Sequence, residues 1–178
     1  MVTAVIIVLG FLTACKKTDE KTTEKIDNWI TVEEFKINLP AEYKTFINHG
    51  DDKDIYAAFK SDNTILFVSK EDYESLKDKG YDPVNMTLTE YIERWKLTLD
   101  NCVMSPEETF ESDGLTYIGY YKIREDSSTS YVSFFYDAND AFWAFAFTCP
   151  RYADEDFVYE ELYYGYLEIA KSVTFKLE

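Results

Sequence analysis

The sequence is short of the residue types that most catalytic and metal sites need. Its 178 residues include one histidine, His49, and three cysteines. His49 lies in the polar stretch HGDDKD, which is typical of a solvated turn, and no G-x-S-x-G nucleophile motif occurs. Zinc is disfavoured because one histidine and cysteines without paired spacing do not supply its usual ligands. These absences argue against a nucleophilic hydrolase and against a zinc protein.

Basic residues are also scarce. The chain has 18 Lys and Arg against 34 Asp and Glu, which leaves a formal net charge of −16. An acidic surface repels phosphate backbones unless basic residues are concentrated in one place, and the sequence has no such basic patch. Nucleic-acid binding is therefore not expected. The same charge disfavours adsorption of the folded domain onto anionic lipid.

The longest apolar run is too short to span a membrane. Residues 2–14 are apolar except for Thr3, Gly10 and Thr13. A transmembrane helix needs about 20 apolar residues, so this length suits the apolar region of an export signal instead. The run ends in Leu12-Thr13-Ala14-Cys15, which resembles the lipobox of bacterial lipoproteins. It departs from a usual export signal in one respect, because no Lys or Arg precedes it.

The lipobox resemblance implies how the N-terminal region is processed. Residues 1–14 would be a signal peptide that is removed, and Cys15 would carry lipid. The stretch KKTDEKTTEK has no apolar residue, so residues 15–25 are expected to be the lipidated cysteine and a flexible tether. The implied location is the extracytoplasmic face of a bacterial cell membrane, held there by lipid on Cys15. The alternative is a buried N-terminal strand or helix that ends in an ordinary cysteine.

Residues 26–178 are expected to form a single folded domain. Hydrophobic residues make up 46% of the chain, which is enough for a core, and no repeat or internal linker interrupts the segment. The alternation FKINLP predicts a first strand. Residues 54–60 and 64–68 flank a polar turn and predict a hairpin. Ser69 is expected to cap a short helix that runs through Lys79 and stops at Gly80.

The clearest helix signal is the pair Thr87 and Glu90, which forms a T-x-x-E capping box. The apolar residues that follow at helical spacing are Leu88, Tyr91, Ile92, Trp95 and Leu99. After this helix the apolar residues recur at every second position, which predicts strands at 115–124 and 131–136. The next segment, AFWAFAFTCP, is apolar on both faces, so we expect a central strand covered on each side. A helix with acids at 154–156 near its start, and a short strand within 172–177, would end the domain.

This order of elements resembles the PsbP-like fold. The segments that carry the resemblance are FKINLPAEY, MTLTEYIERWKLTL, AFWAFAFTCP and LEIAKSVTF. It implies an α+β domain with a central antiparallel β-sheet and helices packed on both faces, an α/β/α sandwich. Members of this family mostly act as non-catalytic binding or assembly modules. The resemblance therefore implies a non-catalytic module. Together with the lipobox motif, the tether and the lack of a catalytic constellation, it predicts a protein without enzymatic activity or cofactor, whose partner is another protein or an envelope ligand.

Two alternatives use the abundant carboxylates. An envelope hydrolase would need two Asp or Glu carboxyl groups about 5–9.5 Å apart in a concave site. A calcium-dependent binding module would use Asp51, Asp52 and Asp54, since Ca²⁺ takes oxygen ligands. The spacing of an EF-hand fails there, because Tyr56 stands at a ligand position and Ala57 stands where the loop needs glycine. These three aspartates are therefore weak candidates, and no metal site is predicted.

With Cys15 lipidated, Cys102 and Cys149 remain, an even number in an exported protein. A disulfide between them would stabilise the fold by about 4 kcal/mol in the chain-entropy model. The alternative is two buried thiols. Cys102 continues the apolar stripe of the helix that starts at Thr87, and Cys149 shares a strand face with Phe147, so burial alone would explain both residues.

Overall fold

A computed structural model of the chain describes residues 28–45, 55–62, 64–97, 102–124, 129–150 and 159–176. The helices in these ranges are α1 (Tyr73–Asp78), α2 (Leu88–Lys96) and α3 (Tyr159–Ala170). The strands are β1 (Trp29–Thr31), β2 (Phe35–Asn38), β3 (Lys44–Thr45), β4 (Ala57–Lys60), β5 (Ile65–Asp72), β6 (Cys102–Met104), β7 (Glu108–Ser112), β8 (Leu115–Arg124), β9 (Thr129–Ala138), β10 (Ala141–Pro150) and β11 (Thr174–Phe175).

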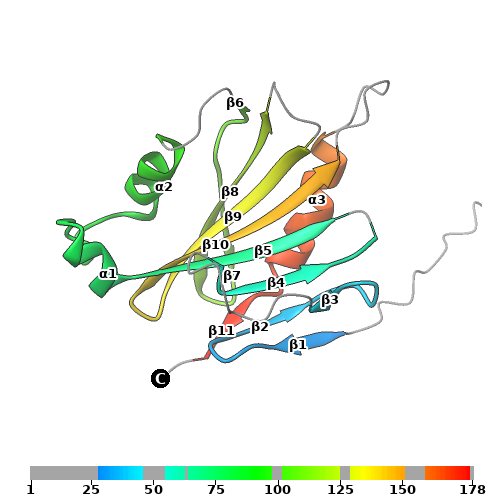
Figure 1. Cartoon of the computed structure of the whole chain (residues 1–178), viewed down its shortest axis with the longest axis horizontal. Coiled ribbons are helices and arrows are strands. Elements are labelled where there is room, and N and C mark those ends of the chain that lie inside the picture. The colour runs from blue at the N-terminus through cyan, green and yellow to red at the C-terminus, as the bar shows by residue number, and fades with distance from the viewer. Residues whose placement is uncertain are drawn as a thin grey trace, which may run out of the picture.

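The strands of the described residues form two sheets (Figure 1). The larger sheet has the order β3-β4-β5-β10-β9-β8-β6, with β7 also paired to β8, and the smaller sheet has the order β1-β2-β11. Neighbouring strands are antiparallel in both sheets. Among the described residues, no helix is long and apolar enough to cross a membrane.

The middle of the larger sheet is β10, which pairs with β5 and β9. Its side chains enter two separate cores: Trp143 and Phe145 belong to one, and Phe142 and Ala144 belong to the other. This arrangement confirms the prediction of a central strand covered on both faces. The β9–β10 hairpin turns at Asn139 and Asp140, whose φ angles of 54° and 51° lie in the left-handed region that a tight two-residue turn requires.

The first core lies between the larger sheet and a layer made of α3 and the smaller sheet. Phe35 and Ile37 of β2 and Leu167 of α3 are buried there. Helix α3 lies close to the sheet where β8 carries a glycine. A Cβ at Gly119 would stand 2.6 Å from the Tyr163 hydroxyl oxygen and 2.8 Å from the Phe134 ring, so only glycine fits this close approach.

The second core lies under α1 and α2, on the other face of the larger sheet. Leu76 of α1 and Ile92 of α2 are fully buried there against β8, β9 and β10. Helix α2 begins with the predicted capping box: the backbone N–H of Glu90 donates to Thr87 Oγ1 at 3.2 Å, and the Thr87 N–H donates to Glu90 Oε2 at 2.7 Å. This prediction is confirmed. Figure 1 shows α2 and α3 on opposite sides of the larger sheet.

The expected α/β/α sandwich needs one correction. Helices do pack on both faces of the antiparallel sheet, but α3 shares its face with the smaller sheet, so the domain is richer in strand than expected. The short last strand is confirmed as β11. The acids at 154–156 and the helical position Leu99 lie outside the described residues.

Two local predictions were wrong. Ser69 does not cap a helix: it lies within β5 and pairs with Ala144, because the ladder with β10 continues to Asp72 before α1 begins. Cys102 does not extend the apolar stripe of α2, because α2 ends at Lys96 and Cys102 begins strand β6, opposite Arg124 of β8. In both places strand pairing outweighs the local helix signal.

Candidate functional site

The end of β5 presents charged residues to both faces of the larger sheet. Successive residues of a strand point to opposite faces, and Lys70 and Glu71 follow this rule. The Lys70 ammonium lies toward the smaller sheet, where it contacts Glu34. The Glu71 carboxylate lies toward the helices, where it contacts Arg94 of α2. Two polar clusters therefore start from neighbouring residues of one strand.

The cluster around Glu71 lines an open groove of about 740 Å³ between β5, α1 and α2. We call it the β5–α2 groove. The lining side chains on which its chemistry depends are Glu71, Lys79, Tyr81, Arg94, Trp95 and Leu97.

Local structure places each of these side chains. Helix α1 ends in a Schellman motif, in which the N–H of Gly80 donates to the Lys77 carbonyl at 2.9 Å and that of Tyr81 donates to the Leu76 carbonyl at 3.0 Å. Gly80 has a φ of 85°, which a residue with a Cβ rarely adopts. This turn directs the chain back past β5, so that Lys79 and Tyr81 lie at the groove. On α2, Arg94 lies beside the buried face formed by Tyr91 and Ile92.

Glu71 is held by two cations. The Arg94 guanidinium donates to both carboxylate oxygens of Glu71 at 3.0 Å, and Lys79 Nζ donates to Oε1 at 2.8 Å. Burial by itself would raise the pKa of Glu71, but the hydrogen bonds from Arg94 and Lys79 outweigh it and the pKa is lowered. In turn, the hydrogen bond to Glu71 raises the pKa of Arg94. Glu71 and Arg94 are therefore both charged at neutral pH.

Exposed apolar side chains border the same charges. Tyr81 is 41% exposed and Leu97 is 86% exposed. The Arg94 guanidinium carbon lies 4.5 Å from the centre of the Tyr81 ring, a cation–π contact that also fixes the orientation of the guanidinium plane. The groove thus combines fixed charge with apolar surface that is not used in the core.

This chemistry suits binding better than acid–base catalysis. Glu71 stays ionised and both of its oxygens already accept hydrogen bonds, so it is a poor proton donor or base. The second carboxylate of the lining, Asp72, is the next residue of β5 and pairs with Lys70 at 2.8 Å. Glu71 and Asp72 therefore do not converge on a shared substrate position, as the hydrolase alternative requires.

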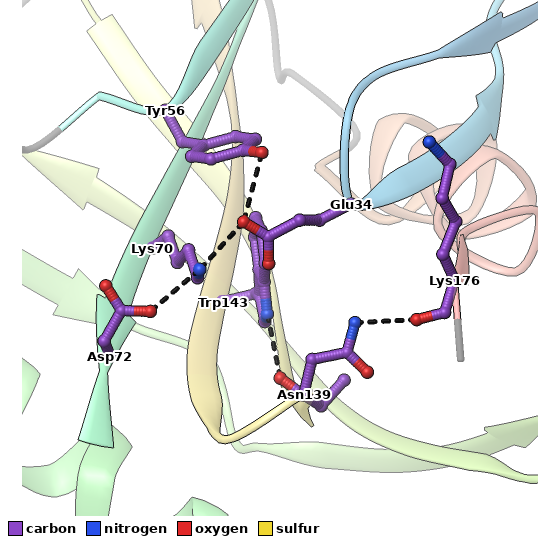
Figure 2. Close-up of polar contacts among 8 residues, drawn as sticks. Glu34, Tyr56, Lys70, Asp72, Asn139, Trp143 and Lys176 are labelled. Carbon is purple, nitrogen blue, oxygen red and sulfur yellow. Dashed lines mark hydrogen bonds and ion pairs between the residues drawn. The ribbon is translucent and has the colours of Figure 1, made fainter. Parts of the chain in front are cut away.

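The second cluster, which we call the inter-sheet cluster, consists of Glu34, Tyr56, Lys70, Asp72 and Trp143 (Figure 2). Lys70 Nζ lies 2.8 Å from Glu34 Oε1 and 2.8 Å from Asp72 Oδ1, and the Tyr56 hydroxyl donates to Glu34 Oε1 at 3.3 Å. Burial and the Glu34 carboxylate raise the pKa of Tyr56 to about 12. Glu34 lies in the turn between β1 and β2, so these contacts join the smaller sheet to the larger one.

The predicted lipid-attachment residue, the single histidine and the weak calcium candidates lie outside the described residues. They are Cys15, His49, Asp51, Asp52 and Asp54. Lipid attachment at Cys15 therefore stays an untested prediction, and calcium binding by the three aspartates stays an untested alternative. Within the described ranges, no group of three or more His, Cys, Asp and Glu is placed to hold a metal ion.

Cys102 and Cys149 lie on strands that are not neighbours. Cys102 begins β6 and Cys149 lies near the end of β10, with β8 and β9 between them. Three strand spacings of about 4.8 Å separate such positions by about 14 Å. A disulfide needs Cα atoms no more than about 6.8 Å apart, so the strand order argues against a bridge. Titration of the unfolded, unreduced protein remains the direct test, and we expect both thiols to react.

The groove residues themselves were not singled out by the sequence. The local sequence pattern predicted a helix from Ser69, whereas residues 69–72 continue β5, whose alternation turns Glu71 toward the helices. A usable signal was present at Gly80, since a helix that ends there sends Lys79 and Tyr81 past the neighbouring strand. The pairing of Glu71 with Arg94, 23 residues further along the chain, has no local signature.

These layers, an antiparallel sheet with helices on one face and a helix and a small sheet on the other, define the class of fold. The solution structure of cyanobacterial PsbP (CyanoP) from Synechocystis sp. PCC 6803 is similar, with a TM-score of 0.60 over 84% of this chain and 92% of that chain. The domain therefore has a PsbP-like fold. Sequence identity to CyanoP is 14%, so the similarity establishes the fold alone.

A second solved structure is less similar to this chain. A crystal structure from Bacteroides thetaiotaomicron VPI-5482 aligns with 81% of this chain and 46% of its own chain at 13% identity, and its TM-score of 0.38 is too low to carry an argument. No protein-family model matches the chain, and no curated protein matches it.

Proposed function

We propose that this protein is a bacterial lipoprotein, anchored through Cys15 at the extracytoplasmic face of the cell membrane, whose PsbP-like domain is a non-catalytic binding module for a protein partner. The lipobox motif supports the anchor. The β5–α2 groove supports the binding role, and it is the observation on which the proposal depends.

The composition of the groove is that of a protein-binding surface. Arginine, tyrosine and tryptophan contribute most to protein–protein binding energy, and Arg94, Tyr81 and Trp95 line the groove together. Arg94 is already oriented by Glu71 and Tyr81, so a partner would not have to immobilise it. This preorganisation supports a binding role over a purely structural one, because Tyr81 and Leu97 remain exposed.

The anchor is tested by metabolic labelling. Cells expressing the protein are grown with radiolabelled fatty acid, and label is expected in the wild-type protein but not in the Cys15→Ala variant. The variant is also expected to leave the membrane fraction. Absence of label from the wild type, or its persistence in Cys15→Ala, would contradict the anchor.

The groove is tested by site-specific photo-crosslinking in intact cells. A photoreactive amino acid replaces Leu97, which is 86% exposed at the groove, or Tyr164, which is 53% exposed on α3 on the other side of the sheet. We expect a discrete adduct from the Leu97 position that weakens when Arg94→Gln is added. Equal adduct yields from both positions would contradict a binding role for the groove. So would an adduct yield at the Leu97 position that is unchanged by Arg94→Gln.

A further inference from the structure

We infer that the β5–α2 groove binds an acidic peptide segment, whose carboxylate is received by Lys79 and Arg94 and whose neighbouring apolar side chains contact Tyr81 and Leu97. This inference rests on the proposed function and names the class of ligand for the same site.

The local charge of the groove favours an anionic ligand. The charged side chains that face the groove are Glu71, Lys79 and Arg94, two cations against one carboxylate. Lys70 and Asp72 also border it, but their side chains point to the other face of β5, where they pair with each other at 2.8 Å. Lys79 and Arg94 are left to share the single carboxylate of Glu71. The groove therefore keeps an excess positive charge in a chain whose formal net charge is −16.

Lys79 and Arg94 keep hydrogen-bonding capacity beyond their contacts with Glu71. An ammonium group has three N–H donors and a guanidinium has five. Glu71 receives one hydrogen bond from Lys79 and two from Arg94. The Lys79 side chain is 53% exposed, so its ammonium can contact a carboxylate that enters from solvent. A carboxylate bound there would be adjacent to both cations.

The apolar border of the groove favours a peptide over other anions. Tyr81 and Leu97 offer apolar contacts that inorganic phosphate cannot use. An anionic membrane surface is disfavoured because the net charge of the domain opposes its approach. An acidic residue flanked by apolar residues in an extended segment can satisfy the cations and the exposed apolar side chains at once.

The test is selection of a displayed random peptide library on the full chain. The ionic strength is kept at about 0.15 M. The Debye length is then about 8 Å, so salt screens the overall negative charge of the protein but not direct ion-pair contacts. The same selection is made on Lys79→Gln/Arg94→Gln and on Lys171→Gln. Lys171 is a matched control, since it also pairs with a glutamate, at 2.6 Å, but follows α3 on the other side of the sheet. Circular dichroism and melting curves confirm that each variant is folded.

We expect wild type and Lys171→Gln to enrich peptides with Asp or Glu beside apolar residues, and the double variant to lose this enrichment. The best peptide should bind the double variant roughly tenfold or more weakly, and replacing its acid by the amide should weaken binding to wild type by a similar factor.

The contrary outcomes separate the two proposals. Enrichment of neutral or basic peptides that depends on Lys79 and Arg94 overturns the acidic ligand but keeps the groove as a binding site. Identical enrichment on wild type and the double variant, or none on either, overturns the groove itself. Displacement of the best peptide by millimolar inorganic phosphate, or by phosphatidylglycerol vesicles, would show a general anion site and also overturn the peptide assignment.

Discussion

Lys70 and Glu71 are neighbours with almost equal burial, yet the clusters they build differ in kind. The Lys70 side chain is 17% exposed and that of Glu71 is 16% exposed. Each forms ion pairs with two partners. The ion pair from Lys70 to Glu34 joins the larger sheet to the smaller one, whereas the partners of Glu71 border an open groove. Burial and ion pairing alone therefore do not distinguish a contact that holds the fold together from one that is available to a ligand.

The surroundings of the two clusters explain the difference. Beneath Lys70 lies Trp143, which is fully buried, and the ammonium is 5.4 Å from the centre of its ring. The Trp143 Nε1–H donates to the Ala138 carbonyl at 3.1 Å, which fixes the ring in the first core (Figure 2). On the groove side, Trp95 is only partly buried and lies edge-on to Phe135. The inter-sheet cluster continues into the core, and the groove opens to solvent.

The largest expected effect contrasts these two tryptophans. Trp143→Ala should lower the free energy of unfolding by about 3–5 kcal/mol, because it leaves a cavity in a closed aromatic core. Trp95→Ala should lower it by only about 1 kcal/mol, because part of the ring is already in water. Urea denaturation followed by far-UV circular dichroism measures both values. Equal losses from the two changes would abolish the distinction between the clusters.

A smaller effect contrasts two lysines that each contact a glutamate at 2.8 Å. Lys70→Met should lower the free energy of unfolding by about 1–2 kcal/mol, because it leaves Glu34 and Asp72 without their shared cation. Lys79→Met should cost about 0–1 kcal/mol, because Lys79 is half exposed and its ion pair is screened. Thermal unfolding at matched pH and salt compares them. If Lys79→Met lowered the free energy of unfolding more than Lys70→Met, the groove cluster, and not the inter-sheet cluster, would be the one that stabilises the fold.

The smallest effect is a dependence on pH. Because pairing lowers the pKa of Glu71 in the folded protein, its contribution to stability is complete above its ordinary pKa and is lost as the pH falls through the lowered value. Wild type should therefore lose more stability than Glu71→Gln between about pH 6 and pH 3, by about 1 kcal/mol or less.

Asp137 supplies a control of opposite sign for that pH series. Burial raises its pKa, although the hydrogen bond from Tyr73 at 2.7 Å opposes the rise. Folding is therefore penalised by ionised Asp137, and this penalty is relieved as the pH falls. Wild type should gain stability on acidification relative to Asp137→Asn. Matching slopes for Glu71→Gln and Asp137→Asn would contradict both assignments.

Local patterns predicted the parts of the fold that depend on near neighbours. The capping box at Thr87, the hairpins and the doubly apolar strand β10 all depend on residues close in sequence, and all three are present. The smaller sheet was not predicted as a separate layer. Its strands are two to four residues long, too short for a clear alternation, and the partner of β2 comes from the other end of the domain.

The candidate groove was beyond prediction for a related reason. Its chemistry depends on the face of the sheet toward which the Glu71 side chain points. The register of β5 against β10 sets that face, and the residues around Glu71 do not. The lipobox-like motif is the reverse case, because it is purely local and can be read without knowing the fold. The anchor that it implies stays a prediction, whereas the proposed ligand site could be found only from the fold.

The pairing of β2 with β11 also sets an order in time. The Asn38 N–H donates to Ser172 Oγ, 134 residues further along the chain, and Thr174 pairs with Lys36. A chain made from its N-terminus cannot close this sheet until Thr174 and Phe175 have been made, and contacts of such long range form slowly. The strands synthesised first are thus among the last to be fixed. During synthesis the β1–β2 segment remains unpaired with β11, and the contact between Phe35 and Phe175 forms only after β11 has been made.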